Sequence, residues 1–381
     1  MHLYNSNYTA DEGRWPARPF WPPAQVSPLL GSSRAGGTAA QVDMQASDRY
    51  VRQCLLPEIG TEGQQRLARA RAVVVGVGAL GTVQASLLVR AGVGETVLID
   101  RDIVELSNLQ RQCLFLERDA DLGTPKAVAA AEALREANSD VSVTAFVNDL
   151  TPSNADRLLA SADVILDGTD NFEARYLIND VAVKRSIAWI YGAAVGTRGS
   201  LMPVVPDRTA CLGCLFPSAP RRRQPTCDTE GVLSSATTLV ASLQVVEALK
   251  VLADRLESLN TRLVSIDAWT GERSSVRADR PEPRCMTCGQ RQFLHLESEA
   301  SPSVRLCGRD AVQVPGGDRE LDLAGLAGKL APLGEVRSSE HAMRFCCPPH
   351  ELTVFPDGRA IVKGTQDLAL ARSLYARFVG N

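Results

Sequence analysis

A glycine-rich turn between a short apolar run and a helical pattern is the feature that most limits how this chain can fold. The β-branched run at 72–75 indicates a buried strand, and the pattern from Leu80 to Arg90 indicates a helix. Between them lies Gly76-Val77-Gly78-Ala79-Leu80-Gly81. Glycines allow a tight turn and close approach of backbone to phosphate, and a helix N-terminus favours negative charge. The unit therefore predicts nucleotide binding; the alternative is a glycine turn that serves only helix–sheet packing.

Strands and helices continue to alternate along the chain. Further strands are expected at 96–99, 141–147, 163–166 and 188–191, with helices at 124–137 and 172–184. This alternation predicts an α/β fold with a Rossmann-like, doubly wound, mostly parallel sheet. After residue 198 the pattern indicates an antiparallel extension, with strands at 201–205, 262–266 and 273–277 and a long helix at 231–252.

Composition shifts suggest three parts. Residues 1–46 are rich in Pro, Gly and small residues, which predicts a disordered extension. Residues 47–290 would form the nucleotide-binding domain. Residues 300–381 would form a small α+β domain, with helices at 321–330 and 368–378 and a hairpin at 351–363.

Charge and hydropathy exclude several functions. The chain has 381 residues, a formal net charge of -3, and 41 basic against 44 acidic residues, which does not fit a nucleic-acid binder. We find no apolar stretch of the ~18 residues that a membrane span needs, and no signal-peptide pattern. We expect a cytoplasmic protein that binds neither nucleic acid nor membrane. Because no histidine lies between residues 48 and 294, chemistry in the main domain must proceed without a histidine base.

Charged residues placed after the predicted strands favour a triphosphate over a dinucleotide. Asp100 ends the second strand, where its carboxylate can bind ribose hydroxyls. Arg111 can grip phosphate oxygens bidentately, and Lys126 adds a point charge. Such cations stabilise charge that develops on an α-phosphate and on leaving pyrophosphate. The alternatives are a surface ion pair for Arg111 and a mere helix-flanking role for Lys126.

Asp170 follows another predicted strand, in Asp167-Gly168-Thr169-Asp170-Asn171. Ligands of open α/β sheets bind at the carboxyl ends of strands. A carboxylate at that edge could hold Mg²⁺, which prefers oxygen ligands and substrate phosphates. The alternative is that Asp170 only caps the next helix.

Two C-x-x-C pairs predict a structural metal site. The cysteines are Cys211, Cys214, Cys285 and Cys288. Four thiolates suit tetrahedral Zn²⁺ in a closed site; the alternative is two unrelated cysteine pairs. Cys227 stands alone before a predicted helix, near Arg221–Arg223, and both features favour a thiolate. Cys54, Cys113 and Cys307 are expected to be small core residues.

Taken together, these motifs resemble the ThiF/MoeB/HesA family of ubiquitin-activating-like adenylyltransferases. The resemblance covers about residues 47–290 and includes the glycine loop and both C-x-x-C pairs. It also includes Arg49-Tyr50-Val51-Arg52-Gln53, Gly60–Gln64, Ala91–Gly94, Ser107–Gln112, Gly123–Lys126, Asp167–Asn171 and Cys227–Val232. Many members have Gly-Gly where this chain has Gly78-Ala79, and since only backbone N–H is needed there, we expect little effect.

The resemblance implies ATP-dependent adenylation of the C-terminal glycine carboxylate of a ubiquitin-like sulphur carrier ending in Gly-Gly. It implies a catalytic set of Arg52, Arg111, Lys126, Asp170 and Cys227, with Arg52 reaching into the partner's site of a homodimer and Cys227 forming a covalent link. The implied nucleotide and Mg²⁺ residues are Gly76, Gly78, Ala79, Gly81, Asp100, Ser107, Asn108, Leu109, Gln110, Arg111, Lys126, Asp170 and Asn171. Because no tail cysteine has the spacing of a rhodanese loop, sulphur would come from a separate sulphurtransferase or cysteine desulphurase.

Other functions remain open on the sequence alone. The acceptor could be a peptide or another small carboxylate. The glycine loop by itself also permits an NAD-dependent dehydrogenase or a non-catalytic nucleotide-binding scaffold. The set of Arg111, Lys126 and Asp170 argues against the last of these.

Overall fold

The chain divides into two units, residues 1–46 and 47–381, of which the second is compact. A computed structural model describes residues 48–218, 227–297, 304–305, 310–316 and 321–380. The predicted extension at 1–46 therefore lies outside the described residues. The second unit contains two sheets.

The first sheet has eight strands in the order β3-β2-β1-β4-β5-β6-β7-β8. Five are parallel: β1 Arg71–Val75, β2 Glu95–Ile99, β3 Ser142–Phe146, β4 Val164–Asp167 and β5 Ala188–Val195. Three extend it antiparallel: β6 Arg198–Val204, β7 Arg262–Asp267 and β8 Arg273–Arg277. The predicted fold class, a doubly wound sheet with an antiparallel extension, is confirmed.

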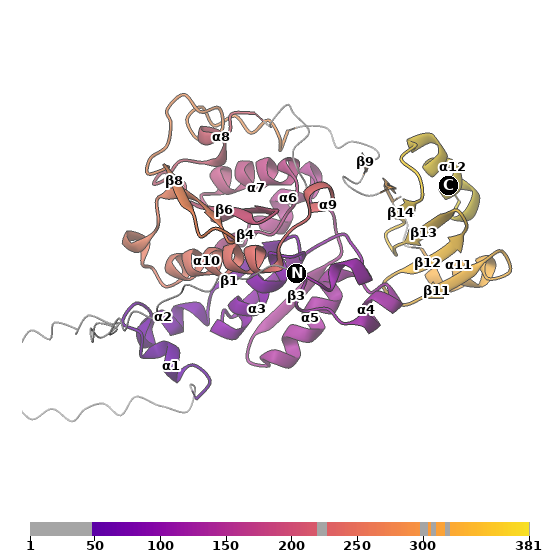
Figure 1. Ribbon diagram of the computed structural model, residues 1–381, viewed down its shortest axis with the longest axis horizontal. Helices are drawn as coiled ribbons and strands as arrows, with labels where there is room; N and C mark the ends of the chain where they lie inside the picture. The colour runs from indigo at the N-terminus through magenta and orange to yellow at the C-terminus, as the bar shows by residue number, and fades with distance from the viewer. Residues whose placement is uncertain (1–47, 219–226, 298–303, 306–309, 317–320, 381) are drawn as a thin grey trace, which may run out of the picture. The chain divides into compact units, whose positions relative to one another are not determined.

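Helices cover both faces of this sheet because its central strands are apolar on both sides (Figure 1). Val74 packs into a cluster with α3 (Gly81–Ala91), α5 (Lys126–Ala137) and α10 (Ser234–Leu252). Its neighbour Val73 faces the other way, toward α6 (Pro152–Leu159) and α7 (Phe172–Arg185). Alternating residues of one strand thus anchor two helical layers.

Helix α10 is long and apolar enough to cross a membrane by length and composition alone, so the prediction that no such stretch exists is wrong. In the fold it packs against the sheet: Val240, Ala241, Val245 and Ala248 are buried. Gln244, also fully buried, donates to the carbonyls of Asp167 and Ile190. The length of this apolar pattern is thus explained by a core position.

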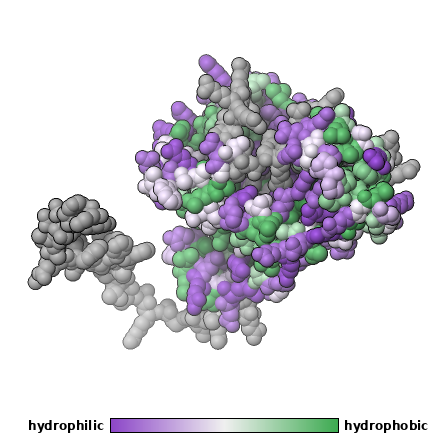
Figure 2. Space-filling model, turned by 45° about the vertical axis from the view of Figure 1, so that its right-hand side comes forward, coloured by the Kyte–Doolittle hydropathy of each residue, from purple (hydrophilic) through white to green (hydrophobic). Residues whose placement is uncertain are grey.

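Short helices complete the first part of the unit: α1 Val51–Cys54, α2 Gly60–Leu67, η2 Leu106–Asn108, α4 Glu117–Leu122, α8 Leu212–Leu215, α9 Cys227–Glu230 and η3 Leu256–Ser258. Hydrophobic and hydrophilic residues are mixed over the surface drawn in Figure 2. Scattered apolar residues are normal on a protein surface.

The second sheet is antiparallel, in the order β11-β12-β13-β14-β10-β9. Its strands are β9 Val304–Arg305, β10 Ala311–Val314, β11 Glu335–Ser338, β12 Met343–Cys347, β13 His350–Val354 and β14 Ala360–Lys363. Helices α11 (Leu323–Leu330) and α12 (Leu368–Phe378) pack on it around Phe345. The β13–β14 hairpin and α12 follow the predicted ranges.

Candidate nucleotide site and cysteine cluster

The glycine loop lies at the topological switch point of the first sheet. Strand β1 pairs with β2 on one side and with β4 on the other, so the loops after β1 and β4 lie side by side at the carboxyl edge, where open α/β sheets bind ligands. A Cβ on Gly81 would lie 1.9 Å from the carbonyl oxygen of Gly76, and one on Gly168 would lie 2.3 Å from that oxygen. Only glycine allows this approach. At Gly78 an added Cβ meets only Gln112 Nε2, at 3.9 Å, so the middle of the loop is open.

Asp100 links the end of β2 to the glycine loop. Its Oδ2 accepts the Val77 N–H at 2.6 Å, and its Oδ1 accepts the Asp102 N–H at 2.7 Å. Burial raises the pKa of the Asp100 carboxyl, against the lowering effect of Lys126. Each carboxylate oxygen keeps a further lone pair, so Asp100 can still accept a ribose hydroxyl.

Lys126 is not a free surface cation. It is 3% exposed, its Nζ lies 3.1 Å from Asp102 Oδ2, and its N–H donates to the Asp102 carbonyl at 2.8 Å. Pro125 is the N-cap of α5, so Lys126 is the first residue of that helix. Its remaining two protons can reach a phosphate. Sequence reasoning did not single out Asp102, although its position two residues after Asp100 is the available signal.

The segment Ser107–Gln112 folds back on itself. Asn108 is buried, and its Oδ1 accepts the Glu105 N–H at 3.1 Å. Arg111 donates from Nη1 to the Ser107 carbonyl at 2.9 Å, which leaves most of its guanidinium donors available. Gln112 is 4% exposed, and its Oε1 has no hydrogen-bond partner among the described residues. Gln112 faces Gly78, and it was not among the predicted site residues.

The Asp167–Asn171 loop is held by a buried ion pair that sequence reasoning missed. Arg175 Nε lies 3.0 Å from Asp167 Oδ2, and Arg175 Nη2 donates to the carbonyls of Thr169 and Gly192. Burial acts against the guanidinium charge, but Asp167, Tyr191 and Asp170 together outweigh it, so the pKa of Arg175 is raised. No local pattern sets Arg175 apart, because α7 also carries Glu173 and Lys184 among its apolar residues.

Asp170 does not cap helix α7. The N-cap is Asn171, whose Oδ1 accepts the Ala174 N–H at 2.9 Å. Asp170 is exposed, and its Oδ1 accepts from Asn171 Nδ2 at 3.2 Å. Capping and ligand binding are thus divided between neighbouring residues, and the carboxylate of Asp170 remains accessible.

Arg52 lies away from its own glycine loop. Helix α1 packs at the far end of α3, where Gln53 Nε2 donates to the Ala91 carbonyl at 2.9 Å. Since α3 begins in the loop at Gly81 and has 11 residues, its ends are about 16 Å apart. Arg52 is exposed there. A role for Arg52 in catalysis would therefore require the site of another copy.

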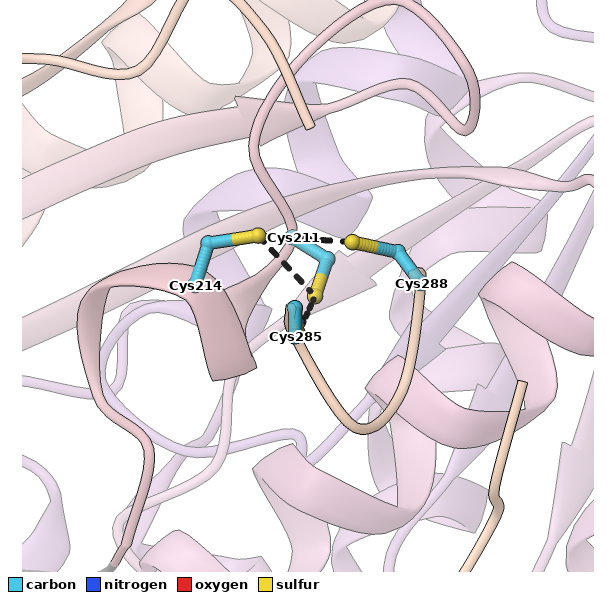
Figure 3. A group of neighbouring side chains, drawn as sticks. All are labelled: Cys211, Cys214, Cys285 and Cys288. Atoms are coloured by element: carbon cyan, nitrogen blue, oxygen red, sulfur yellow. Dashed lines mark hydrogen bonds between the residues drawn. The ribbon is translucent and has the colours of Figure 1, made fainter. Parts of the chain in front are cut away.

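The two C-x-x-C pairs meet (Figure 3). Sγ separations are 3.5 Å for Cys211–Cys285, 3.7 Å for Cys211–Cys214 and 3.3 Å for Cys214–Cys288. All four Sγ atoms lie within 4.8 Å of one another. Zn–S bonds of about 2.3 Å in a tetrahedron place sulphurs about 3.8 Å apart, so the group fits Zn²⁺.

Helix α7 supports this cluster from its middle. Asn179 Oδ1 accepts the Leu212 N–H at 2.9 Å, beside Cys211. Asp180 accepts the N–H groups of His295 and Leu296 and the Thr287 hydroxyl, and burial raises the pKa of its carboxyl. The turns that carry both cysteine pairs are therefore tied to one buried helix.

The predictions for the remaining cysteines have different outcomes. Cys113 is exposed, so its predicted core position is wrong, and Cys54 is only half-buried. Both lie in short helical or turn segments that place few side chains inside. Cys227 is the first residue of α9, but its side chain, like Arg221–Arg223 and Cys307, lies outside the described residues.

A doubly wound sheet with a glycine loop at its switch point and charged side chains on both sides defines a nucleotide-binding α/β protein. The model of the ThiF family matches residues 50–287. The chain belongs to the ThiF family.

Curated relatives cover more than this region. The sulfur carrier protein ThiS adenylyltransferase of Bacillus subtilis is 45% identical over 337 residues, covering 87% of this chain and 99% of that protein. The SAMP-activating enzyme E1 of Haloferax volcanii is 42% identical over 250 residues, covering 65% of this chain and 91% of that protein. Residues 1–287 are too few to supply 87% of the chain, so the Bacillus match extends into the C-terminal part.

Solved structures agree with the fold. The crystal structure of E. coli MccB with ATP has a TM-score of 0.56 and 25% sequence identity, and the match covers 64% of this chain and 75% of that chain.

Proposed function

We propose that this chain is an ATP-dependent adenylyltransferase that activates the C-terminal glycine carboxylate of a ubiquitin-like sulphur carrier. The observation that carries the proposal is the carboxyl edge at the switch point, which has an open glycine loop on one side and the accessible Asp170 on the other, in a chain of the ThiF family. Adenylyltransferase relatives at 45% and 39% identity support the reaction class. An NAD-dependent dehydrogenase is correspondingly disfavoured.

The chemistry needs positioning and charge stabilisation rather than a base. A carboxylate oxygen of the carrier attacks the α-phosphorus of ATP; a bond from this oxygen to phosphorus forms, and the bond from phosphorus to the oxygen of pyrophosphate breaks. The carboxylate is already ionised at neutral pH, so no proton is removed. This agrees with the absence of histidine between residues 48 and 294. The site must therefore offset negative charge that develops on the phosphates.

The residues divide by the part of ATP they face. The Val77 N–H is taken by Asp100 and the Thr82 N–H by the Gly78 carbonyl, so the N–H groups between them, at residues 78–81, are the ones that would face phosphate. Asp100 takes the ribose hydroxyls, and Lys126 and Arg111 approach the phosphates. The segments Ser107–Gln110 and Asp170–Asn171 close the site from either side. Mg²⁺, held by Asp170 with substrate phosphates, would neutralise charge on the leaving pyrophosphate.

Two further roles concern residues that are not part of this phosphate-facing set, Arg52 and Cys227. Arg52 would complete the site of a partner copy in a homodimer, because it lies at the far end of α3 from its own loop. Cys227, at the start of α9, would form a covalent link with the activated carrier: its sulphur attacks the acyl carbon of the acyl-adenylate, the bond from this carbon to the AMP oxygen breaks, and AMP leaves. Through a persulfide delivered by a separate sulphurtransferase or desulphurase, the link would instead be to the carrier's sulphur. The enzyme would act in the cytoplasm.

Zn²⁺ would have a structural role at the four cysteines. The site is closed, since all four ligands come from the protein and Cys211 and Cys285 are buried. A metal there would join the turn before α8 to the end of residues 47–290, which we propose form the adenylation domain.

The test is carrier-dependent ATP–pyrophosphate exchange with small proteins that end in Gly-Gly. The wild type should exchange only when the matching carrier is present. Arg111→Ala and Asp170→Ala should lose exchange by about 10²–10³-fold. Arg118→Ala is the control, because Arg118 is 73% exposed on the adjoining α4 and should behave as wild type. Normal exchange by Arg111→Ala or Asp170→Ala would contradict the site, and carrier-free exchange with a peptide or small carboxylate would change the acceptor.

A further inference from the structure

The residues that follow β2 alternate between two neighbours. Asp100, Asp102 and Val104 face the first sheet: the two carboxylates bond Val77 N–H and Lys126, and Val104 is in the core. Ile103 and Glu105 face the C-terminal sheet, while the Arg101 side chain pairs with Asp149. An extended segment presents successive side chains to opposite sides, so one stretch of backbone belongs to both domains.

Three kinds of contact join this segment to the C-terminal sheet. Ile103 packs in one apolar cluster with Ala311, Ala342, Phe355 and Ile361. Lys363 of β14 forms an ion pair with Glu105. Glu105, in turn, donates its N–H to Asn108 Oδ1, at the turn that carries Arg111.

Arg359 makes the third contact and bonds the backbone itself. Its Nη1 donates to the Arg101 carbonyl at 3.3 Å, and its Nη2 donates to the Val147 carbonyl at 2.8 Å. These carbonyls lie just beyond the ends of β2 and β3. The side chain is buried and lies over the Phe355 ring at 4.3 Å, which fixes the guanidinium. The planar fork of arginine can serve two carbonyls at once, whereas a lysine cannot reproduce that geometry.

We infer that the C-terminal domain is a positioning element of the nucleotide site, acting through Arg359. By holding the carbonyls of Arg101 and Val147, Arg359 fixes the backbone between Asp100 and Asp102. This places the ribose-binding carboxylate and the Asp102–Lys126 pair together. The inference rests on the proposed ATP site, and it assigns to residues outside the ThiF-family region a role in ATP binding.

The experiment measures binding of ATP and of 3′-deoxy-ATP, each with Mg²⁺, to the full chain by calorimetry. Arg359→Ala should weaken ATP binding about tenfold, as expected when one buried hydrogen-bonding group is removed. The preference for ATP over 3′-deoxy-ATP should also shrink, since Asp100 would no longer be aligned with the ribose. Arg359→Lys should restore little of either. Simple loss of folded protein would lower the number of binding sites without changing this preference.

Arg377→Ala is the matched control. Arg377 is an exposed arginine of α12 in the same domain, and its contact is the Phe378 ring at 5.1 Å. It should bind both nucleotides as the wild type does. If circular dichroism shows Arg359→Ala to be unfolded, Lys363→Met replaces it, with an expected loss of about threefold because its ion pair is partly exposed.

The outcomes separate the two proposals. A wild type that binds neither nucleotide overturns the proposed function and this inference with it. A wild type that binds ATP, together with a folded Arg359→Ala of unchanged affinity and unchanged preference, overturns only the positioning role. Where Lys363→Met is the variant used, an affinity for ATP equal to that of Arg377→Ala overturns the positioning role.

Discussion

The proposed nucleotide site and the cysteine cluster are built in different ways. At the nucleotide edge of the sheet, charged side chains from several separate elements bond one another. At the cysteine cluster, four thiols from two short turns face a common centre. Lys126 bonds Asp102, which is partly exposed, and Arg175 bonds Asp167 in a pair that is buried on both sides. Among the described residues, the four thiols have hydrogen-bond partners only in each other and in the nearby backbone. Protein groups balance the charges at the first site, while at the second we propose that a metal ion balances the thiolates. Helix α7 supports both, through Arg175 near its start and Asn179 in its middle.

The largest effect should come from breaking the buried pair beneath the nucleotide edge. Arg175→Met leaves the carboxylate of Asp167 buried and without its cation, which should lower the free energy of unfolding by about 3–5 kcal/mol. Urea denaturation measures this. Arg185→Ala, on the same helix as Arg175, is the control, because the ion pair of Arg185 with Asp156 of α6 is exposed to solvent and its loss should change the free energy of unfolding little. Equal losses in the two variants would mean that burial does not distinguish the pairs.

Replacing Lys126, the cation that we propose faces the phosphates, should lower activity without lowering the metal content. Lys126→Ala should lower carrier-dependent ATP–pyrophosphate exchange by about 10²–10³-fold. Metal content, measured by mass spectrometry, should stay at the wild-type level because the cluster shares no ligand with Lys126. Lys184→Ala, an exposed lysine of α7, should change neither quantity. Loss of metal from Lys126→Ala would show that the two sites are not independent.

Metal removal tests the cysteine cluster, and it should change stability. A chelator should lower the stability of the zinc-loaded wild type by about 2.7 kcal/mol if free Zn²⁺ had been a hundred times its Kd. Cys288→Ser should purify with little zinc, and its thermal midpoint should be unaffected by the chelator. Cys113→Ser, at an exposed cysteine, is the control and should retain the metal. A wild type purified without chelator that contains no zinc would contradict the assignment.

The smallest effect concerns pH. Because burial raises the pKa of Asp100 in the folded protein, its contribution to stability is present at low pH and is lost as pH rises above the ordinary carboxyl value of about 4. The stability of Asp100→Asn relative to wild type should therefore improve between pH 4 and pH 7, while its affinity for ATP falls. Urea denaturation at the two pH values measures the first change. A relative stability that declines over this range would contradict the direction of the shift.

Local patterns in the sequence were enough for much of this structure. The glycine loop, the strand ends at Asp100 and Asp170, and the paired C-x-x-C turns are each set by residues close together in the chain. Periodicity located α12 and the β13–β14 hairpin for the same reason. A tight turn requires its glycine and a metal-binding turn requires its cysteines, whatever the surrounding structure. These features could therefore be predicted before the fold was known.

Only the tertiary structure decided which groups are partners. Arg175 meets Asp167 through the packing of α7 on β4, and Arg359 reaches Arg101 across 258 positions of sequence. Nothing local distinguishes these arginines from surface ones. Their roles depend on burial, because a buried charge or carbonyl must find a partner, and the identity of that partner is fixed by which elements the fold brings together.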